Sequence, residues 1–127
     1  EAMKYAKERV QFGKPIGSFQ LIQAKLADMF AQIESAKLLA YKAAVMAGRA
    51  ERGGKGTTVH QISAAAILLA AETACKVTEE AVQIHGGYGY CLEYPVQRYW
   101  RDAKLGTIGA GTSEMRRLIV ARELLSM

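Results

Sequence analysis

Apolar residues recur every three or four positions along most of this chain, which is the spacing of one face of an α-helix. The longest such series follows Ser18, which we expect to cap a helix that ends where residues 49–56 bring charge and three glycines. This face must pack against other helices, and the small alanines in its second half permit a close approach. Its members are Phe19, Ile22, Leu26, Met29, Ile33, Ala36, Ala40, Ala43 and Ala47.

A second long helix is predicted to begin at Thr57 or Thr58 and to pack antiparallel to the first. Its apolar series comprises Ala66, Ala70, Ala74, Val77, Ala81 and Ile84. His60 falls in the first turn, where we expect a solvated or capping histidine and assign no catalytic role. The longest unbroken apolar run, 64–71, is too short to cross a bilayer, so we expect no membrane partner.

Shorter helical patterns occupy the two ends of the chain. Residues 1–10 resemble the end of a helix, which the two glycines and the proline of residues 12–17 interrupt. A further helix is expected with Pro95 in its first turn, and a last one over Glu114–Leu125. No stretch alternates polar and apolar residues for long, so the sequence predicts a single all-α domain.

Three glycines fall within four residues at the end of the second long helix, in the segment Gln83–Tyr90. A helix C-cap followed by a loop accounts for this composition, because glycine adopts backbone angles that a side chain penalises. Close approach of the backbone to a flat or charged ligand accounts for it equally well. The segment does not match a dinucleotide-binding fingerprint, since no strand precedes it.

Two helical runs meet at residues 107–112, which we call the hinge. Gly109 and Gly111 should relieve backbone strain there, and Thr112 or Ser113 can cap the last helix. The free N–H groups of such a helix start favour a phosphate, a carboxylate or a developing oxyanion. Ordinary connections between helices share this composition, so a ligand site and a plain connection both remain open.

Charge and cysteine usage narrow the function classes. The chain holds 17 Lys and Arg against 12 Asp and Glu, a formal net charge of +5. These charges are interleaved without a basic block, which argues against nucleic-acid binding and favours a phosphate-bearing small molecule or an acidic partner. Cys75 and Cys91 form no Cys-x-x-Cys motif or Cys/His cluster, so we expect reduced thiols in an intracellular protein and no structural metal.

Six ordered segments together resemble the carboxy-terminal helical domain of the acyl-CoA dehydrogenases. The resemblance implies an up-and-down four-helix bundle with an additional short helical segment, with residues 1–127 forming the last of three domains in a flavoenzyme. The segments are Tyr5–Ile16, Phe19-Gln20, Gln83–Tyr90, Tyr94-Pro95, Arg101–Lys104, and Gly111–Glu114 followed by Arg117–Arg122.

The resemblance also implies which residues contact FAD and substrate. One set matches contacts to FAD bound mainly by a neighbouring subunit: Arg9, Phe12, Gln20, Gln83, Ile84, His85, Gly86 and Gly87. Thr112, Ser113 and Glu114 match contacts to the FAD of their own subunit. The segment Gly109–Gly111, with Ala110 at its centre, is expected to line the acyl-thioester pocket.

The implied reaction is α,β-dehydrogenation of an acyl-CoA thioester. In this reaction a carboxylate removes the α proton, FAD accepts the β hydrogen as hydride, and an electron-transfer flavoprotein reoxidises the cofactor. The family resemblance implies a homodimer or homotetramer, in the cytoplasm of a bacterium or in a mitochondrial matrix. We expect this chain alone to be inactive, to lack stable FAD binding and to self-associate.

One departure from the commonest family pattern concerns the catalytic base. Most members carry Glu where this chain has Ala110, and an aromatic residue is frequent where it has Gly109. The hinge instead resembles the branched-chain type that acts on isovaleryl-CoA, whose base lies on the preceding helix, upstream of Glu1. We therefore expect no catalytic residue in this chain and a branched, cyclic or short-chain substrate.

Two carboxylates were weighed as substitutes for that base. We expect Glu93 to cap the next helix and Glu114 to face the flavin, so neither is assigned the role. Two alternatives to the dehydrogenase remain open: a flavin oxidase or monooxygenase with the same fold, and a catalytically silent helical assembly domain.

Overall fold

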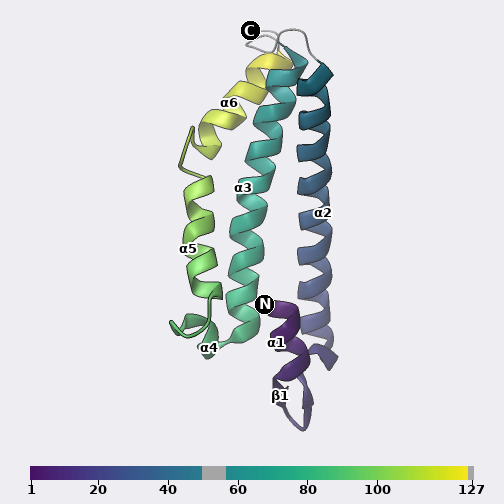
Figure 1. Cartoon of the computed structure of the whole chain (residues 1–127), viewed down its shortest axis with the longest axis vertical. Coiled ribbons are helices and arrows are strands. Elements are labelled where there is room, and N and C mark those ends of the chain that lie inside the picture. Colours follow the sequence, from purple (N-terminus) through teal and green to yellow (C-terminus); the bar gives the residue numbers. More distant parts are fainter. Residues whose placement is uncertain (50–56, 126–127) are drawn as a thin grey trace.

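The computed structural model describes residues 1–49 and 57–125, and over these residues the chain is almost entirely helical (Figure 1). The helices are α1 (Ala2–Glu8), α2 (Gln20–Arg49), α3 (Thr58–His85), α4 (Gly87–Tyr90), α5 (Val96–Gly106) and α6 (Ser113–Leu124). Between α1 and α2 lie strands β1 (Val10–Gln11) and β2 (Lys14–Pro15) and the 3-10 turn η1 (Ile16–Ser18). The all-α prediction is confirmed. The expected end of the first long helix at 49–56 falls mostly outside the described residues.

Helix α3 is the centre of the molecule. It packs against α2 on one side, and on the other side it packs against α5 and then α6, which follow one another along its length (Figure 1). Thr57 caps α3 as predicted, because its side chain accepts a hydrogen bond from the N–H of His60 at 3.2 Å. The two long helices pack antiparallel, as predicted, and α5 and α6 share the opposite side of α3.

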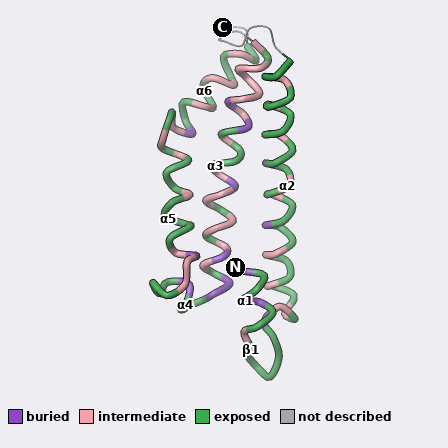
Figure 2. The backbone as a smooth tube through the Cα atoms, viewed as in Figure 1, coloured by how far each residue is buried: buried purple, intermediate pink, exposed green. Residues whose placement is uncertain are grey.

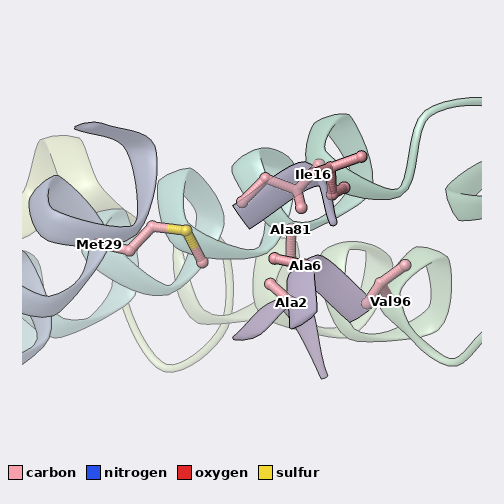
Figure 3. Packing of buried hydrophobic residues seen from close by; sticks show 7 residues of the cluster. Ala2, Ala6, Ile16, Met29, Ala81 and Val96 are labelled. Carbon is pink, nitrogen blue, oxygen red and sulfur yellow. The ribbon is translucent and has the colours of Figure 1, made fainter. Parts of the chain in front are cut away.

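The main cluster of buried side chains lies at the end of the bundle where α1 meets α3 (Figure 2). Val96 at the start of α5 is 1% exposed, and Ala6 of α1 is equally buried. Burying one valine side chain stabilises a fold by about 1.5–3 kcal/mol. The cluster, shown in Figure 3, comprises Ala2, Ala6, Ile16, Met29, Ala81, Ile84 and Val96. This packing holds the first turns of α2 and α5 against the end of α3.

The predicted apolar face of α2 is buried only in part. Met29 and Ala36 are buried, whereas Ala40 and Ala47 are exposed, so the face loses its cover toward the end of the helix. A different face of α2 exposes large apolar side chains: Phe30, Leu38, Tyr41 and Val45. An apolar surface of this extent on one helix is typical of a face that another protein surface covers.

Between α1 and α2 one local prediction is wrong and another is incomplete. Ser18 does not cap α2; its hydroxyl donates to the Pro15 carbonyl at 2.7 Å within the 3-10 turn, and α2 begins at Gln20. The segment predicted only as a helix break also forms a hairpin, in which Val10 pairs with Pro15. Phe12 and Gly13 form the turn of this hairpin, with φ values of 53° and 79°. Such positive angles favour glycine, so the phenylalanine at position 12 gave no indication of this turn.

Helix α3 is also long and apolar enough, by length and composition alone, to be a candidate membrane span. Within the bundle α3 contacts α2, α5 and α6. This packing covers only part of its apolar surface, since 22% of its most apolar stretch is buried.

Candidate functional site

The first candidate region is a hollow of about 440 Å³ beside the end of α3, which we call the Arg9 hollow. It brings together Arg9, which follows α1, with the segment 84–87 at the junction of α3 and α4. Five residues predicted to contact FAD therefore lie in one place, although Arg9 is far in sequence from the other four. The lining consists of Tyr5, Arg9, Gln11, Ile16, Ile84, His85, Gly86, Gly87, Tyr88 and Cys91.

Aromatic rings fix the base of this hollow. The Arg9 guanidinium lies over the ring of Tyr88, 5.0 Å from its centroid. His85 is 3% exposed, stacks on Tyr5 at 4.2 Å between centroids, and bonds through Nδ1 to the Ala81 carbonyl. Burial raises the pKa of Tyr5, even though Arg9 acts in the opposite direction. Since no carboxylate lines the hollow, its charge favours an anion.

The three glycines at the end of α3 have different causes. Gly86 ends α3 with a φ of 60°, which a side chain disfavours. Gly89 packs against α3 so closely that a Cβ would lie 2.5 Å from the Val82 carbonyl oxygen. Gly87 has neither constraint: its φ is not positive, and a Cβ there would meet nothing within 4 Å. Helix capping and packing therefore explain two of the glycines, and only Gly87 is left for close approach of a ligand.

Three residues predicted for the same cofactor set are not part of the hollow. Phe12 is 91% exposed at the hairpin turn. Gln20 and Gln83 are also exposed, and neither lines the hollow. Any contact that these side chains make to a cofactor must come from the outer surface rather than from within the Arg9 hollow.

The second candidate region is the hinge, where the chain leaves α5. The N–H groups of Ile108 and Gly109 donate to the Leu105 carbonyl, so α5 ends in a tight turn. The left-handed residues that follow are Ala110, with a φ of 51°, and Gly111, with a φ of 98°. The expectation that Gly109 supplies such an angle is wrong, and the residue that does is alanine, for which this conformation costs about 1–2 kcal/mol.

Gly109 is explained by packing at the end of α5. A Cβ at this position would lie 3.2 Å from the Leu105 carbonyl oxygen, closer than most real contacts. Glycine is therefore favoured there by the turn itself, in addition to any room it leaves for a substrate. Thr112 caps α6 as predicted, because its hydroxyl oxygen accepts from the N–H of Met115 at 3.3 Å.

A groove of about 740 Å³ opens beside the hinge, between α3 and α5, and we call it the hinge groove. Ser113 lines it and is 7% exposed, yet its hydroxyl has no hydrogen-bond partner among residues 1–49 and 57–125. In the same described ranges no hydrogen bond engages the N–H groups of Ala110 and Gly111. A buried hydroxyl without a partner is costly, so Ser113 indicates a ligand in the groove. Ala110 and Gly111 are exposed and do not line the groove, so their N–H groups are open to water or to a ligand at the hinge itself. The groove is lined by Glu72, Cys75, Lys76, Glu79, Trp100, Lys104, Thr107, Ile108, Thr112, Ser113 and Glu114.

Acidic and basic side chains nearly balance in the hinge groove. Glu114 accepts hydrogen bonds from its own backbone N–H and from the Thr112 hydroxyl, and these bonds lower its pKa. The groove also holds Glu72 and Glu79, against two lysines. Because Arg117 pairs with Glu72, the charges of the groove nearly balance, and it lacks the positive excess of the Arg9 hollow that would favour a polyanion. The acidic contribution of α3 was not predicted, because its glutamates give no signal apart from helical spacing.

No proton-abstracting carboxylate is found at the hinge itself. The side chain of Ala110 is a methyl group, and the hydrogen bonds that lower the pKa of Glu114 make its carboxylate a weaker base. Glu93 does not cap α5, contrary to expectation. The residue at the N-cap is Pro95, and no side-chain hydrogen bond caps this end of the helix. No group of three metal-binding side chains occurs in the part of the chain that the structure describes.

The two regions lie on different sides of α3. Glu72, Cys75, Lys76 and Glu79 share one face of the helix, and this face lines the hinge groove. At 3.6 residues per turn, Ile84 and His85 lie roughly 130° around the helix from the centre of that face, one on each side. The Arg9 hollow therefore opens away from the hinge groove, with α3 between them.

Comparison with known proteins places the chain in a family. A profile described as "Acyl-CoA dehydrogenase, C-terminal domain" matches residues 1–125. The mitochondrial isovaleryl-CoA dehydrogenase of Oryza sativa subsp. japonica is 47% identical over 123 residues, which make up 97% of this chain and 29% of that protein.

Solved structures agree with the sequence match. Butyryl-CoA dehydrogenase from Megasphaera elsdenii superposes with a TM-score of 0.88 at 48% identity, over 98% of this chain and 31% of that one. An FAD complex of PigA superposes with a TM-score of 0.87 at 30% identity, over 97% of this chain and 30% of that one. The chain thus spans about a third of the length of these relatives. It belongs to the acyl-CoA dehydrogenase family and corresponds to the carboxy-terminal helical domain of its members.

Proposed function

We propose that this chain is part of an FAD-dependent enzyme that dehydrogenates an acyl-CoA thioester between its α and β carbons. The observation that carries the proposal is the hinge groove, where the buried Ser113 hydroxyl has no partner in the described ranges. Membership of the acyl-CoA dehydrogenase family supports the same chemistry. Bound FAD supplies the acceptor for the β hydride.

The residues of this chain hold different parts of the cofactor. Arg9 fits the pyrophosphate, because a guanidinium forms paired, charge-assisted hydrogen bonds to phosphate oxygens and Gly87 leaves room beside it. Thr112, Ser113 and the Glu114 carboxylate fit a neutral part of the flavin that carries its own donors. Since α3 separates the two regions, we infer that each contacts a different FAD, the Arg9 hollow that of a neighbouring subunit.

The hinge forms one wall of the acyl pocket in this proposal. Removal of an α proton beside a thioester produces an enolate, which backbone N–H groups at the hinge stabilise by hydrogen bonds to its oxygen. Ala110 cannot accept the proton, so the carboxylate base must come from outside residues 1–127. The small side chains at 109–111 favour a branched, cyclic or short acyl group near the thioester.

The exposed apolar face of α2 is our candidate for the oligomer interface. Phe30, Leu38 and Tyr41 are each more than 60% exposed, and a second subunit would remove them from water. A homodimer or homotetramer follows from this proposal, and an electron-transfer flavoprotein is the proposed electron acceptor.

The test uses the full-length protein purified with its flavin. Under anaerobic conditions, isovaleryl-CoA or butyryl-CoA should bleach the flavin absorbance, and an electron-transfer flavoprotein should restore it. Fast reoxidation by oxygen alone would instead indicate an oxidase or a monooxygenase. A flavin that no thioester in a panel of straight, branched and cyclic chains reduces would overturn the proposal and leave an assembly domain.

A further inference from the structure

The hinge contains an alanine in a conformation that glycine normally occupies. Ala110 has a φ of 51° and lies between two glycines, one of which, Gly111, is also left-handed. A non-glycine residue keeps such an angle only when its surroundings fix it. The neighbouring contacts must therefore include one that holds the peptide of Ala110 in place.

That contact comes from Arg116 in the first turn of α6. Its Nη2 donates to the Ala110 carbonyl oxygen at 2.5 Å. The guanidinium also lies against Gly111, where a Cβ would be 3.7 Å from Nη2. A charged donor makes a stronger hydrogen bond to a carbonyl than a neutral one does. The guanidinium thus holds both left-handed residues of the hinge from one side.

The placement of Arg116 is unfavourable for α6 by itself. A positive side chain in the first turn opposes the helix dipole, which is positive at that end. The Nε of Arg116 is also buried and has no partner within residues 1–49 and 57–125. Two unfavourable features at one residue indicate that its contact with the hinge serves a purpose other than stabilising the helix. The next residue, Arg117, differs, since it is half exposed and pairs with Glu72 at 2.6 Å.

We propose that Arg116 is a positioning residue that fixes the peptide between Ala110 and Gly111 and so sets the shape of the acyl-pocket wall. The inference rests on the proposed function, because it assumes that the hinge lines that pocket. The Ala110 carbonyl is held by Arg116, and the N–H of Gly111 belongs to the same peptide unit, so its direction is held too. Loss of the guanidinium lets this peptide rotate and leaves α6 and its Thr112 cap intact.

The kinetic test compares three variants of the full-length holoenzyme. Arg116→Met should lower kcat about tenfold or more, retain bound flavin, and reduce the preference between branched and straight acyl-CoA substrates. Arg116→Lys should recover part of kcat, because an ammonium still donates to the carbonyl. Arg117→Met is the matched control: it removes the same charge one residue later and should leave the substrate preference unchanged.

A second measurement does not depend on activity. Hydrogen exchange at the amides of Gly109 and Ser113, which donate hydrogen bonds on either side of the peptide, should be faster in Arg116→Met than in the wild type, and unchanged in Arg117→Met. Adding Ala110→Gly to Arg116→Met should raise the exchange rate by more than Ala110→Gly raises it in the wild type, because both changes remove a restraint on one peptide. Unchanged exchange in Arg116→Met, or a kcat and preference within twofold of the wild type, would overturn the proposal. If no thioester reduces the flavin but exchange rises as expected, the positioning role of Arg116 is supported and the proposed function fails.

Discussion

The Arg9 hollow and the hinge groove lie against the same helix but differ in almost every physical property. The hollow has one guanidinium, four aromatic rings nearby and no carboxylate in its lining. The groove has three carboxylates, two lysines and a buried hydroxyl without a partner in the described ranges. In the proposed function, this difference assigns the hollow to the charged middle of FAD and the groove to its neutral flavin end.

The two regions are also fixed by different means. In the Arg9 hollow, ring stacking and the close fit of Gly89 against α3 hold the side chains, so the site depends on packing. In the hinge groove, a strained backbone held by hydrogen bonds presents N–H groups, so the site depends on one peptide conformation. Substitutions in the hollow should therefore change cofactor affinity, whereas substitutions at Ala110 or Arg116 should change turnover.

The largest expected effect is at Arg9. Arg9→Met in the full-length protein should weaken FAD binding about 10- to 100-fold, because a hydrogen bond to a charged group contributes about 1.5–3 kcal/mol. The FAD affinity of Arg9→Lys should fall between those of Arg9→Met and the wild type, since an ammonium lacks the planar pair of donors. The measurement is fluorescence titration of apoprotein with FAD, with Arg98→Met as an exposed arginine control. Equal affinities for Arg9→Met and the wild type would mean that the hollow does not contact the pyrophosphate.

A smaller effect is expected at Gly87, the glycine that the fold itself does not require. Gly87→Ala should leave the melting temperature of the apoprotein unchanged and should weaken FAD binding about tenfold if the backbone approaches the cofactor closely. Gly48→Ala is the matched control, since a Cβ there also meets nothing within 4 Å and it should leave FAD affinity unaltered. If Gly87→Ala binds FAD as the wild type does, close approach at this glycine is excluded.

The smallest expected effect concerns pH and Glu114. Its pKa is lowered from 4.5 in the folded state, first by its own backbone N–H and then by the Thr112 hydroxyl. A carboxyl group whose folded pKa is depressed contributes stability above its unfolded value, and this contribution is lost as the pH falls through the folded pKa. As the pH falls below 4.5, the Glu114→Gln variant should therefore lose less stability than the wild type does, as measured by thermal unfolding.

Because the Glu114 side chain is exposed, this difference should be small and should decrease at high salt. Glu93→Gln, which removes another exposed carboxylate, should follow the wild-type pH dependence more closely. Parallel curves for Glu114→Gln and the wild type would show that the hydrogen bonds to Glu114 contribute nothing to folding.

Helices and caps were predictable from the sequence, whereas local backbone geometry was not. Thr57 and Thr112 cap their helices as expected, because a threonine before an apolar helical series has few other local options. Ser18 satisfies the same rule but bonds within a 3-10 turn, since the hairpin before it fixes where α2 begins. The short hairpin itself depends on tertiary packing of Ile16 that no local pattern reveals.

The candidate site was predictable through its motifs but not through its contacts. The resemblance placed Arg9 and the Gly86-Gly87 pair in one cofactor set, and the fold brings them together. It did not indicate that Tyr88 lies under Arg9, or that Arg116 holds Ala110. Both contacts depend on side-chain orientations across a turn, which the spacing of residues along the chain does not determine.

The central inference, that the two regions of one chain contact two different FAD molecules, can be tested by mixing subunits. One variant carries Arg9→Met and the other carries Thr112→Ala with Ser113→Ala, and each alone should bind FAD weakly. A complex containing one subunit of each, isolated through two affinity tags, should hold one intact site in every pair of sites. We expect flavin content near half of the wild type in that mixed complex. A content no higher than that of the two parent variants would contradict the inference and assign both regions to one flavin.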